Sequence, residues 1–197
     1  MKKTGCSVLI VLAVVIGGFA IWGITTYNGM VKRDQGVKTA WSKVESAYQR
    51  RADLIPNLVN TVKGAADFEK STLTAVIQAR ASATSIKIDP AHITPQQLRQ
   101  FQQAQGALSN ALSRLMVTVE RYPELKANRN YLALQSQLEG TENRIKVERD
   151  RFNDSVKGFN TLVKTFPNKL LAGIFGFQEK GYFQSDVGAQ KAPEVKF

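Results

Sequence analysis

An uncharged, almost wholly apolar run near the N terminus is the feature that most constrains this chain. No charged residue occurs from Ser7 to Tyr27. Twenty-one helical residues, at about 1.5 Å each, span roughly 30 Å, the thickness of the hydrocarbon core of a bilayer. Trp22 and Tyr27 stand where an interfacial aromatic belt would lie. We therefore expect residues 1–27 to form one transmembrane anchor.

A cleavable signal peptide is the rival interpretation of this run. Lys2 and Lys3 resemble the basic start of such a peptide, but its apolar region is usually about 7–15 residues long and a small-x-small site follows it. Cys6, the single cysteine, precedes the apolar run, whereas a lipoprotein acylation cysteine follows one. These comparisons favour an anchor that is retained.

The orientation of the anchor is less constrained, because basic residues flank both ends of the run. Long domains cross membranes largely regardless of their charge, so both orientations stay open. A basic start followed at once by an apolar run is typical of an uncleaved export signal. We expect a single-pass protein of the bacterial cytoplasmic (inner) membrane, with its domain outside the cytoplasm.

The charge balance favours a negatively charged partner. The chain has 27 Lys and Arg against 16 Asp and Glu, a net charge of +11, which suits anionic lipid or an acidic polymer. A well-solvated surface explains the same excess. Acidic residues are interleaved with the basic ones and no recognition motif is present, so no nucleic-acid partner is expected.

Beyond the anchor, two interleaved sets of mostly apolar residues recur every seven positions, which predicts a helix that packs along its length. Their members are Asp34, Trp41, Tyr48, Ile55 and Val62, and Val37, Val44, Arg51, Leu58 and Ala65. Asp34 and Arg51 are the polar exceptions. Pro56 lies inside the pattern, where it removes one backbone hydrogen bond, so we expect a kink rather than an end.

Further helices are expected downstream of a weak segment at 64–67. A helical stretch resumes near Leu73, and 82–94 is expected to be a loop. Thr94-Pro95-Gln96-Gln97 combines an N-cap threonine, proline at the first helical position and glutamine three residues after the cap. The helix that starts there should end at Pro123.

The last long helix should follow a short turn and end at Pro167. A short connection makes neighbouring helices antiparallel, and no segment alternates as a strand does. The predicted fold class is therefore all-α: a single N-terminal transmembrane helix followed by an antiparallel long-helix bundle. The bundle domain should cover 28–183, and 184–197 should be a disordered tail.

The sequence contains no recognisable catalytic constellation. His92 is the only histidine, which excludes paired Glu-x-x-His ligands and a His-x-x-x-His zinc site. No glycine-rich phosphate loop is present. We expect no catalytic residue, metal or cofactor, although carboxylates and hydroxyls leave an unrecognised activity open.

Several polar residues lie within or beside the apolar stripes. Buried polar groups must be hydrogen-bonded and buried charges paired, so these residues face solvent, fix the helix register, or bind a small polar or acidic ligand. The nine positions are Arg51, Asp53, Asn57, Asn128, Glu142, Asn143, Arg144, Asn153 and Asn160. The candidate polar network or ligand site comprises Arg51, Asp53, Asn57, Glu142, Asn143 and Arg144.

An apolar, Phe- and Gly-rich stretch follows Pro167. One interpretation is that it folds back over an open end of the bundle. The other is that Ile174, Phe175 and Phe177 contact lipid or a second subunit, since exposed apolar surface usually marks a contact.

Several motifs in the same order resemble the LemA family and together cover most of 27–183. They include Arg51-x-Asp53-Leu54-Ile55-Pro56-Asn57-Leu58, Tyr122-Pro123-x-Leu125-Lys126-Ala127-Asn128 and Thr141-Glu142-Asn143-Arg144-Ile145. Phe68 and Gln137 depart from the family pattern, in which histidine and glutamate are common there. The resemblance implies a membrane-anchored helical bundle without established enzymatic activity. One branch of the family is associated with building magnetosome membranes.

Two functional hypotheses follow. The first is a non-enzymatic scaffold or membrane-organising protein of the bacterial cell envelope, which contacts lipid through its anchor and associates with itself or with envelope proteins. The second is a sensor or binding module for an anionic small molecule or envelope polymer.

Overall fold

The computed structural model describes residues 2–64 and 68–184, and within these ranges all regular secondary structure is α-helical. This confirms the predicted fold class. The tail predicted to be disordered, 184–197, lies outside the described residues from 185 onward. The helices are α1 (Lys2–Lys63), α2 (Lys70–Ser85), α3 (Pro95–Val119), α4 (Pro123–Lys126), α5 (Arg129–Lys164) and α6 (Asn168–Phe175).

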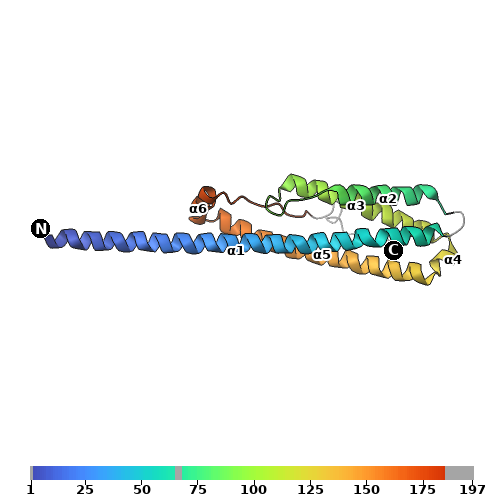
Figure 1. Ribbon diagram of the computed structural model, residues 1–197, viewed down its shortest axis with the longest axis horizontal. Helices are drawn as coiled ribbons and strands as arrows, with labels where there is room; N and C mark the ends of the chain where they lie inside the picture. Colours follow the sequence, from blue (N-terminus) through green and yellow to red (C-terminus); the bar gives the residue numbers. More distant parts are fainter. Residues whose placement is uncertain (1, 65–67, 185–197) are drawn as a thin grey trace, which may run out of the picture.

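Helix α1 joins the apolar run to the bundle without a break. It contains 62 residues, which corresponds to roughly 93 Å, and its N-terminal part projects alone from the bundle (Figure 1). Among the described residues it is the one helix that is long and apolar enough to cross a membrane. The expected boundary between residues 27 and 28 therefore falls inside a continuous helix.

The helix also continues through Pro56 to Lys63. Leu58 and Val62, beyond the proline, are completely buried in the bundle. Their packing holds the last turns of α1 in place although Pro56 cannot donate a backbone hydrogen bond.

The bundle consists of two antiparallel helix pairs (Figure 1). Helix α5 runs back along α1, so that Gly29 lies against Leu162 and Arg51 reaches Glu142. Helix α3 runs back along α2, which also packs on α1. The predicted antiparallel arrangement is thus present in both pairs.

Helix α2 extends to Ser85. The loop expected at 82–94 therefore begins later than predicted. Ala83 is buried against the core, and this packing outweighs the weak helix propensity of the small residues around it. The hydroxyls of Thr84 and Ser85 donate to the carbonyl oxygens of Arg80 and Ser82 within the same turn.

Local chemistry sets the starts of α3 and α5. The Thr94 hydroxyl accepts from the backbone N–H of Gln97, and the Gln97 side chain accepts from the N–H of Thr94, which completes the predicted capping box. Asn128, one of the nine polar positions, caps α5 by accepting from the backbone N–H groups of Asn130 and Tyr131.

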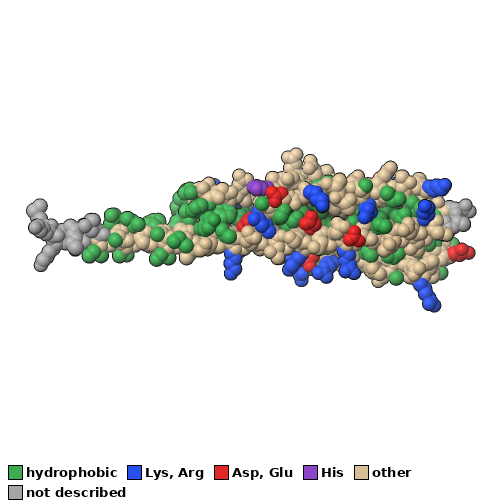
Figure 2. Space-filling model, in the orientation of Figure 1, with side chains coloured by type: hydrophobic (Ala, Val, Ile, Leu, Met, Phe, Trp, Pro, Cys, Tyr) green, Lys and Arg blue, Asp and Glu red, His purple; other side chains and the backbone are tan. Residues whose placement is uncertain are grey.

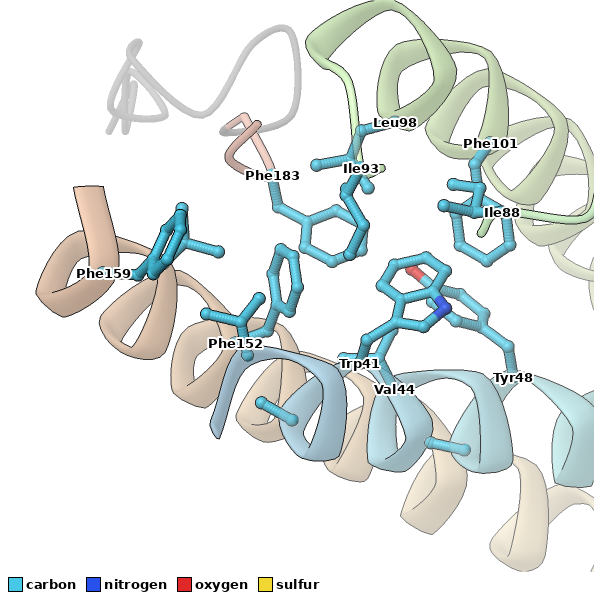
Figure 3. Close-up of a cluster of buried hydrophobic side chains, with 14 of the residues drawn as sticks. Trp41, Val44, Tyr48, Ile88, Ile93, Leu98, Phe101, Phe152, Phe159 and Phe183 are labelled. Carbon is cyan, nitrogen blue, oxygen red and sulfur yellow. The ribbon is translucent and has the colours of Figure 1, made fainter. Parts of the chain in front are cut away.

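The half of the core nearer to the apolar run of α1 is rich in aromatic side chains (Figure 3). The Trp41 ring lies 5.4 Å from Phe101 and 5.6 Å from Phe152, and it stacks on Phe183 at 6.1 Å, all between ring centroids. A second, mostly aliphatic cluster fills the distal half and contains residues of α1, α2, α3, α4 and α5.

The chain after α6 forms an extended strap, residues 177–184, that runs along α5 and reaches the N-terminal half of α3. Gly176 ends α6 in the left-handed conformation, with φ of 74°. Phe183 is buried in the aromatic core. The stretch after Pro167 therefore folds back onto the bundle, as one of the two interpretations expected.

Candidate functional site

Arg51 is a buried charged residue at the centre of the bundle, with only 1% of its surface exposed. Its Nη1 donates to Ser109 Oγ at 2.7 Å and to Glu142 Oε1 at 2.6 Å. Its Nη2 donates to the backbone oxygen and the side-chain Oε1 of Gln105. One guanidinium thus joins α1, α3 and α5.

The Arg51 hydrogen bonds lie at the floor of a cleft of about 620 Å³ between α3 and α5. The cleft begins where the strap ends, because Gln184 at the end of the strap is hydrogen-bonded to Gln102 and Arg149. Its walls carry amides, hydroxyls, carboxylate and guanidinium groups. The lining includes Tyr48, Arg51, Gln103, Gln105, Ser109, Asn110, Glu142 and Arg149.

The volume of this cleft suits a small molecule, since ligand pockets are commonly about 300–1,000 Å³. The Glu142 side chain is 44% exposed and faces Arg51 at the cleft. An anionic ligand would therefore have to replace this carboxylate as the partner of Arg51. The chemistry available is anion binding through charge-assisted hydrogen bonds.

The other members of the predicted network do not join Arg51. Asp53 is exposed and accepts from Gln49 Nε2 at 2.7 Å. Asp53 and Arg144 line a separate groove along α1 and α5 that also contains Arg50. Asn57 and Asn143 are exposed. The structure therefore brings together Arg51 and Glu142, and it places Arg144 outside their cleft.

Gln105 and Ser109 are functional candidates that the sequence interpretation did not select. Gln105 is buried, and its amide nitrogen donates to the carbonyl oxygen of Ala83 at 3.1 Å. It occupies a position in the apolar stripe of α3, between Phe101 and Leu108. The position of the polar Gln105 within an apolar stripe was the feature of the sequence that could have identified it.

Asn153 and Asn160 have a different task, because each holds the backbone of the strap. Asn160 donates to the carbonyl oxygen of Lys180 at 2.8 Å and accepts from its N–H at 2.9 Å. Asn153 makes the same pair of bonds to Phe183, at 3.1 and 2.9 Å. In a β-sheet, the backbone of an extended segment forms hydrogen bonds with a neighbouring strand. Here the side-chain amides of Asn153 and Asn160 form those hydrogen bonds with the strap.

Asp34, the other polar exception in the seam of α1, pairs with two lysines. Its carboxylate oxygens lie 2.9 Å from Lys38 Nζ and 2.9 Å from the buried Lys180 Nζ. Burial raises the pKa of the Asp34 carboxyl, but the hydrogen bonds from Lys38 and Lys180 outweigh it and leave the pKa below 3.8. The pair ties the strap to α1.

His92 lies in the exposed loop before α3, with its Nδ1 3.0 Å from Asp89 Oδ2. In residues 2–64 and 68–184 no three His, Cys, Asp or Glu side chains are grouped as metal ligands.

The predicted lipid or subunit contact, Ile174, Phe175 and Phe177, lies at the end of the bundle next to the apolar run of α1. Ile174 is 75% exposed and Phe175 52%, whereas Phe177 is half-buried. The Tyr27 ring lies 4.8 Å from the Phe175 ring and 5.9 Å from the Phe177 ring, between centroids. Helix α6 therefore sits beside α1 at the residue where the apolar run ends (Figure 1).

The fold and these surfaces define a class: a membrane-associated, all-helical protein with one N-terminal apolar helix that continues into a bundle. The model of the LemA family matches residues 40–197. The chain belongs to the LemA family.

Curated relatives match over most of the chain. It is 28% identical over 194 residues to magnetosome protein MamQ 2 of Paramagnetospirillum magneticum, covering 90% of this chain and 71% of the relative. Magnetosome protein MamQ of Magnetospirillum gryphiswaldense is 29% identical over 174 residues, with 80% and 64% covered. Protein LemA of Metamycoplasma hominis is 25% identical over 171 residues, with 86% and 74% covered.

Proposed function

We propose that this protein is a non-enzymatic structural protein of the bacterial cytoplasmic membrane, which organises that membrane by presenting its bundle to other copies or to envelope proteins. The observation that carries the proposal is the continuity of α1 from the apolar run into the seam of the bundle. A continuous helix fixes the height and direction of the bundle relative to the membrane-spanning segment. Neighbouring molecules would then meet in a defined register.

The relatives support this role. Two of them are magnetosome proteins by name, and the longer of the two matches covers 90% of this chain. Because one branch of the family is associated with building magnetosome membranes, this similarity suits a protein that works at a membrane.

Breaking the continuity of α1 tests the proposal. A seven-residue Gly-Ser insertion between Tyr27 and Asn28 separates the anchor from the bundle by a flexible link. A seven-residue insertion of helix-forming Ala, Glu and Lys at the same place is the matched control, because it adds about two whole turns and keeps the helix stiff. The readout is chemical crosslinking of the full chain in native membranes.

We expect crosslinked assemblies, either of the protein with itself or with a distinct partner, for the wild type and for the helical insertion. The flexible insertion should reduce their yield. A wild-type protein that stays monomeric and captures no partner contradicts the proposal, and so does a flexible variant that assembles as well as the control.

The bundle is proposed to lie outside the cytoplasm. Reporters fused after Phe197, one that fluoresces only in the cytoplasm and one that is active only after export, test this orientation. Activity of the exported reporter alone supports it. Fluorescence of the cytoplasmic reporter alone reverses the orientation, and anionic lipid of the inner leaflet would then face the basic bundle.

A binding module for an anionic small molecule is the second candidate function, and the Arg51 cleft favours it. A thermal-shift screen of the full chain against anionic metabolites and cell-wall fragments tests it, because a ligand that binds only the folded state raises its stability. Glu142→Gln should strengthen such binding by removing the competing carboxylate, whereas Arg51→Met should abolish it. A screen without any shift counts against this function.

A further inference from the structure

The outer face of α6 is apolar, although nothing in the described chain covers it. Phe166, just before the helix, is 83% exposed, Leu170 is 60% exposed and Ile174 75%. Leu170 and Ile174 are four residues apart in α6 and therefore lie on one side of the helix, and Phe166 precedes the helix by two residues. These three exposed residues are here called the α6 stripe. The opposite side carries Ala172, which is buried against the bundle.

This concentration is unlike the rest of the bundle surface. Among the described residues beyond Tyr27, nine large apolar side chains are exposed, and four of them lie between 166 and 175. The others are scattered over α2, α3, α5 and the strap. Scattered apolar residues are ordinary on a protein surface, but a contiguous group marks a contact.

The position of α6 identifies what that contact is. Through Phe175 the helix touches Tyr27, the last residue of the apolar run. In Figure 2 the green surface of α6 lies next to the green surface of the projecting part of α1. A membrane crossed by that part of α1 has its surface at the level of Tyr27, because the run has the length of one hydrocarbon core.

The charged residues around α6 are of the kind expected at a membrane surface. Lys169 is exposed on α6 itself, and Lys164, at the end of α5, is 61% exposed and paired with Glu179. Lysines at such a position place their apolar stems along the interface and their ammonium groups among lipid headgroups. No acidic residue occurs within α6.

We propose that α6 is a second membrane contact, in which the α6 stripe lies in the headgroup and upper acyl region of the same bilayer that α1 crosses. This inference rests on the insertion of α1 that the proposed function assumes. It deepens that function, because two contacts, one spanning and one lying on the surface, fix the rotation of the bundle about α1 as well as its height.

Depth-dependent quenching tests the inference with the full chain. In a Cys6→Ser background, a single cysteine at Ile174 is labelled with an environment-sensitive fluorophore, and the protein is reconstituted into vesicles of phosphatidylethanolamine with a minor share of phosphatidylglycerol. Lipids carry a quencher either near the headgroup or deep in the acyl chain. Val117→Cys is the matched control, because Val117 is 71% exposed near the C-terminal end of α3. That end leads to α4, which lies at the end of the bundle away from the projecting part of α1 (Figure 1).

A third label, at Ile16→Cys on the exposed surface of α1, reports on insertion itself. We expect a blue shift and quenching by the shallow lipid quencher at Ile174, quenching by the deep quencher at Ile16, and neither at Val117. Quenching at Ile16 without quenching at Ile174 beyond the Val117 level overturns the inference alone. Absence of quenching at Ile16 removes the membrane insertion and with it the proposed function.

A second copy of the chain is the competing occupant of the α6 stripe. It would give a blue shift at Ile174 that grows with protein density in the vesicles and no quenching by lipid, and this result also overturns the inference. The variant Leu170→Ser with Ile174→Ser provides an independent readout. It should leave the helical content unchanged, and it should make the label at Phe166→Cys more accessible to a water-soluble quencher.

Discussion

The guanidinium of Arg51 and the carboxylate of Glu142 meet at 2.6 Å across α1 and α5, although 91 residues separate them in the sequence. The pair is unequal. The Arg51 side chain is 2% exposed, whereas the Glu142 side chain is 44% exposed. Arginine has therefore lost nearly all its water and depends on protein acceptors, while glutamate keeps part of its hydration.

This inequality predicts different costs for the two partners. Arg51→Met leaves the buried side-chain oxygen of Gln105 without its donor and should lower the free energy of unfolding by about 2 kcal/mol. Glu142→Gln keeps an acceptor and should cost less than about 1 kcal/mol. Arg50→Met, at the exposed neighbouring position, is the control and should change stability by less than about 0.5 kcal/mol.

Denaturation of the solubilised full chain, followed by the fluorescence of the buried Trp41, measures these differences. Equal losses for Arg51→Met and Arg50→Met would contradict a central role for the buried guanidinium.

The strap should come loose when its amide partners are removed. Asn160→Ala deletes two hydrogen bonds to the backbone of Lys180, and its cost should be about 1–3 kcal/mol, because both backbone groups lose their partner in a buried place. Hydrogen exchange at the Lys180 amide should speed up strongly. Asn143→Ala, an exposed asparagine on the same helix, should leave that amide protected.

Two glycine substitutions should have opposite effects on stability. A Cβ at Gly181 would lie 2.9 Å from the Cα and the nitrogen of Pro95, which are backbone atoms, so Gly181→Ala must displace the strap and should cost about 1–3 kcal/mol. A Cβ at Gly140 meets nothing within 4 Å, so Gly140→Ala on α5 should stabilise by about 0.5–1 kcal/mol. Unfolding midpoints of the two variants check both signs.

The Asp34 carboxylate should contribute to stability only above acidic pH. Its pKa in the folded protein is below 3.8 because the Lys38 and Lys180 hydrogen bonds outweigh burial. A lowered folded pKa stabilises above the unfolded pKa of about 3.9, and the contribution disappears as the pH falls through the folded value. Asp34→Asn should therefore be less stable than wild type at pH 7, and the difference should shrink in acid.

Urea unfolding midpoints at a series of pH values measure this convergence. Asp154→Asn, which removes an exposed carboxylate from α5, controls for the loss of one negative charge. A gap between wild type and Asp34→Asn that stays constant from neutral pH into acid would refute the role assigned to the ion pair.

The parts of the fold that could be predicted are those set by local chemistry. The capping box at Thr94 is complete in four consecutive residues, and the seam of α1 repeats every seven. The continuity of α1 through Tyr27 could not be predicted in the same way. The polarity of the side chains changes there, so a composition pattern suggests a boundary, whereas the backbone hydrogen bonds of a helix are the same in lipid and in water.

For the site, sequence identified individual residues but not their partners. Arg51 and Glu142 were both selected, yet Arg144 was grouped with them. Residues two apart on a helix point about 200° away from each other, which is why Arg144 faces a different groove from Glu142. The partners of Asn153 and Asn160 are backbone atoms of the strap, and backbone atoms leave no trace in a side-chain pattern.

Because α1 is unbroken, the proposed membrane-spanning segment and the bundle move as one rigid body. About 36 residues of α1 follow Tyr27, a length of roughly 54 Å. An apolar helix that is longer than the local bilayer is thick accommodates the mismatch by tilting. A tilt of about 10° at the membrane swings the far end of such an arm sideways by about 9 Å. A local change in bilayer thickness thus becomes a displacement as wide as a helix at the opposite end of the molecule.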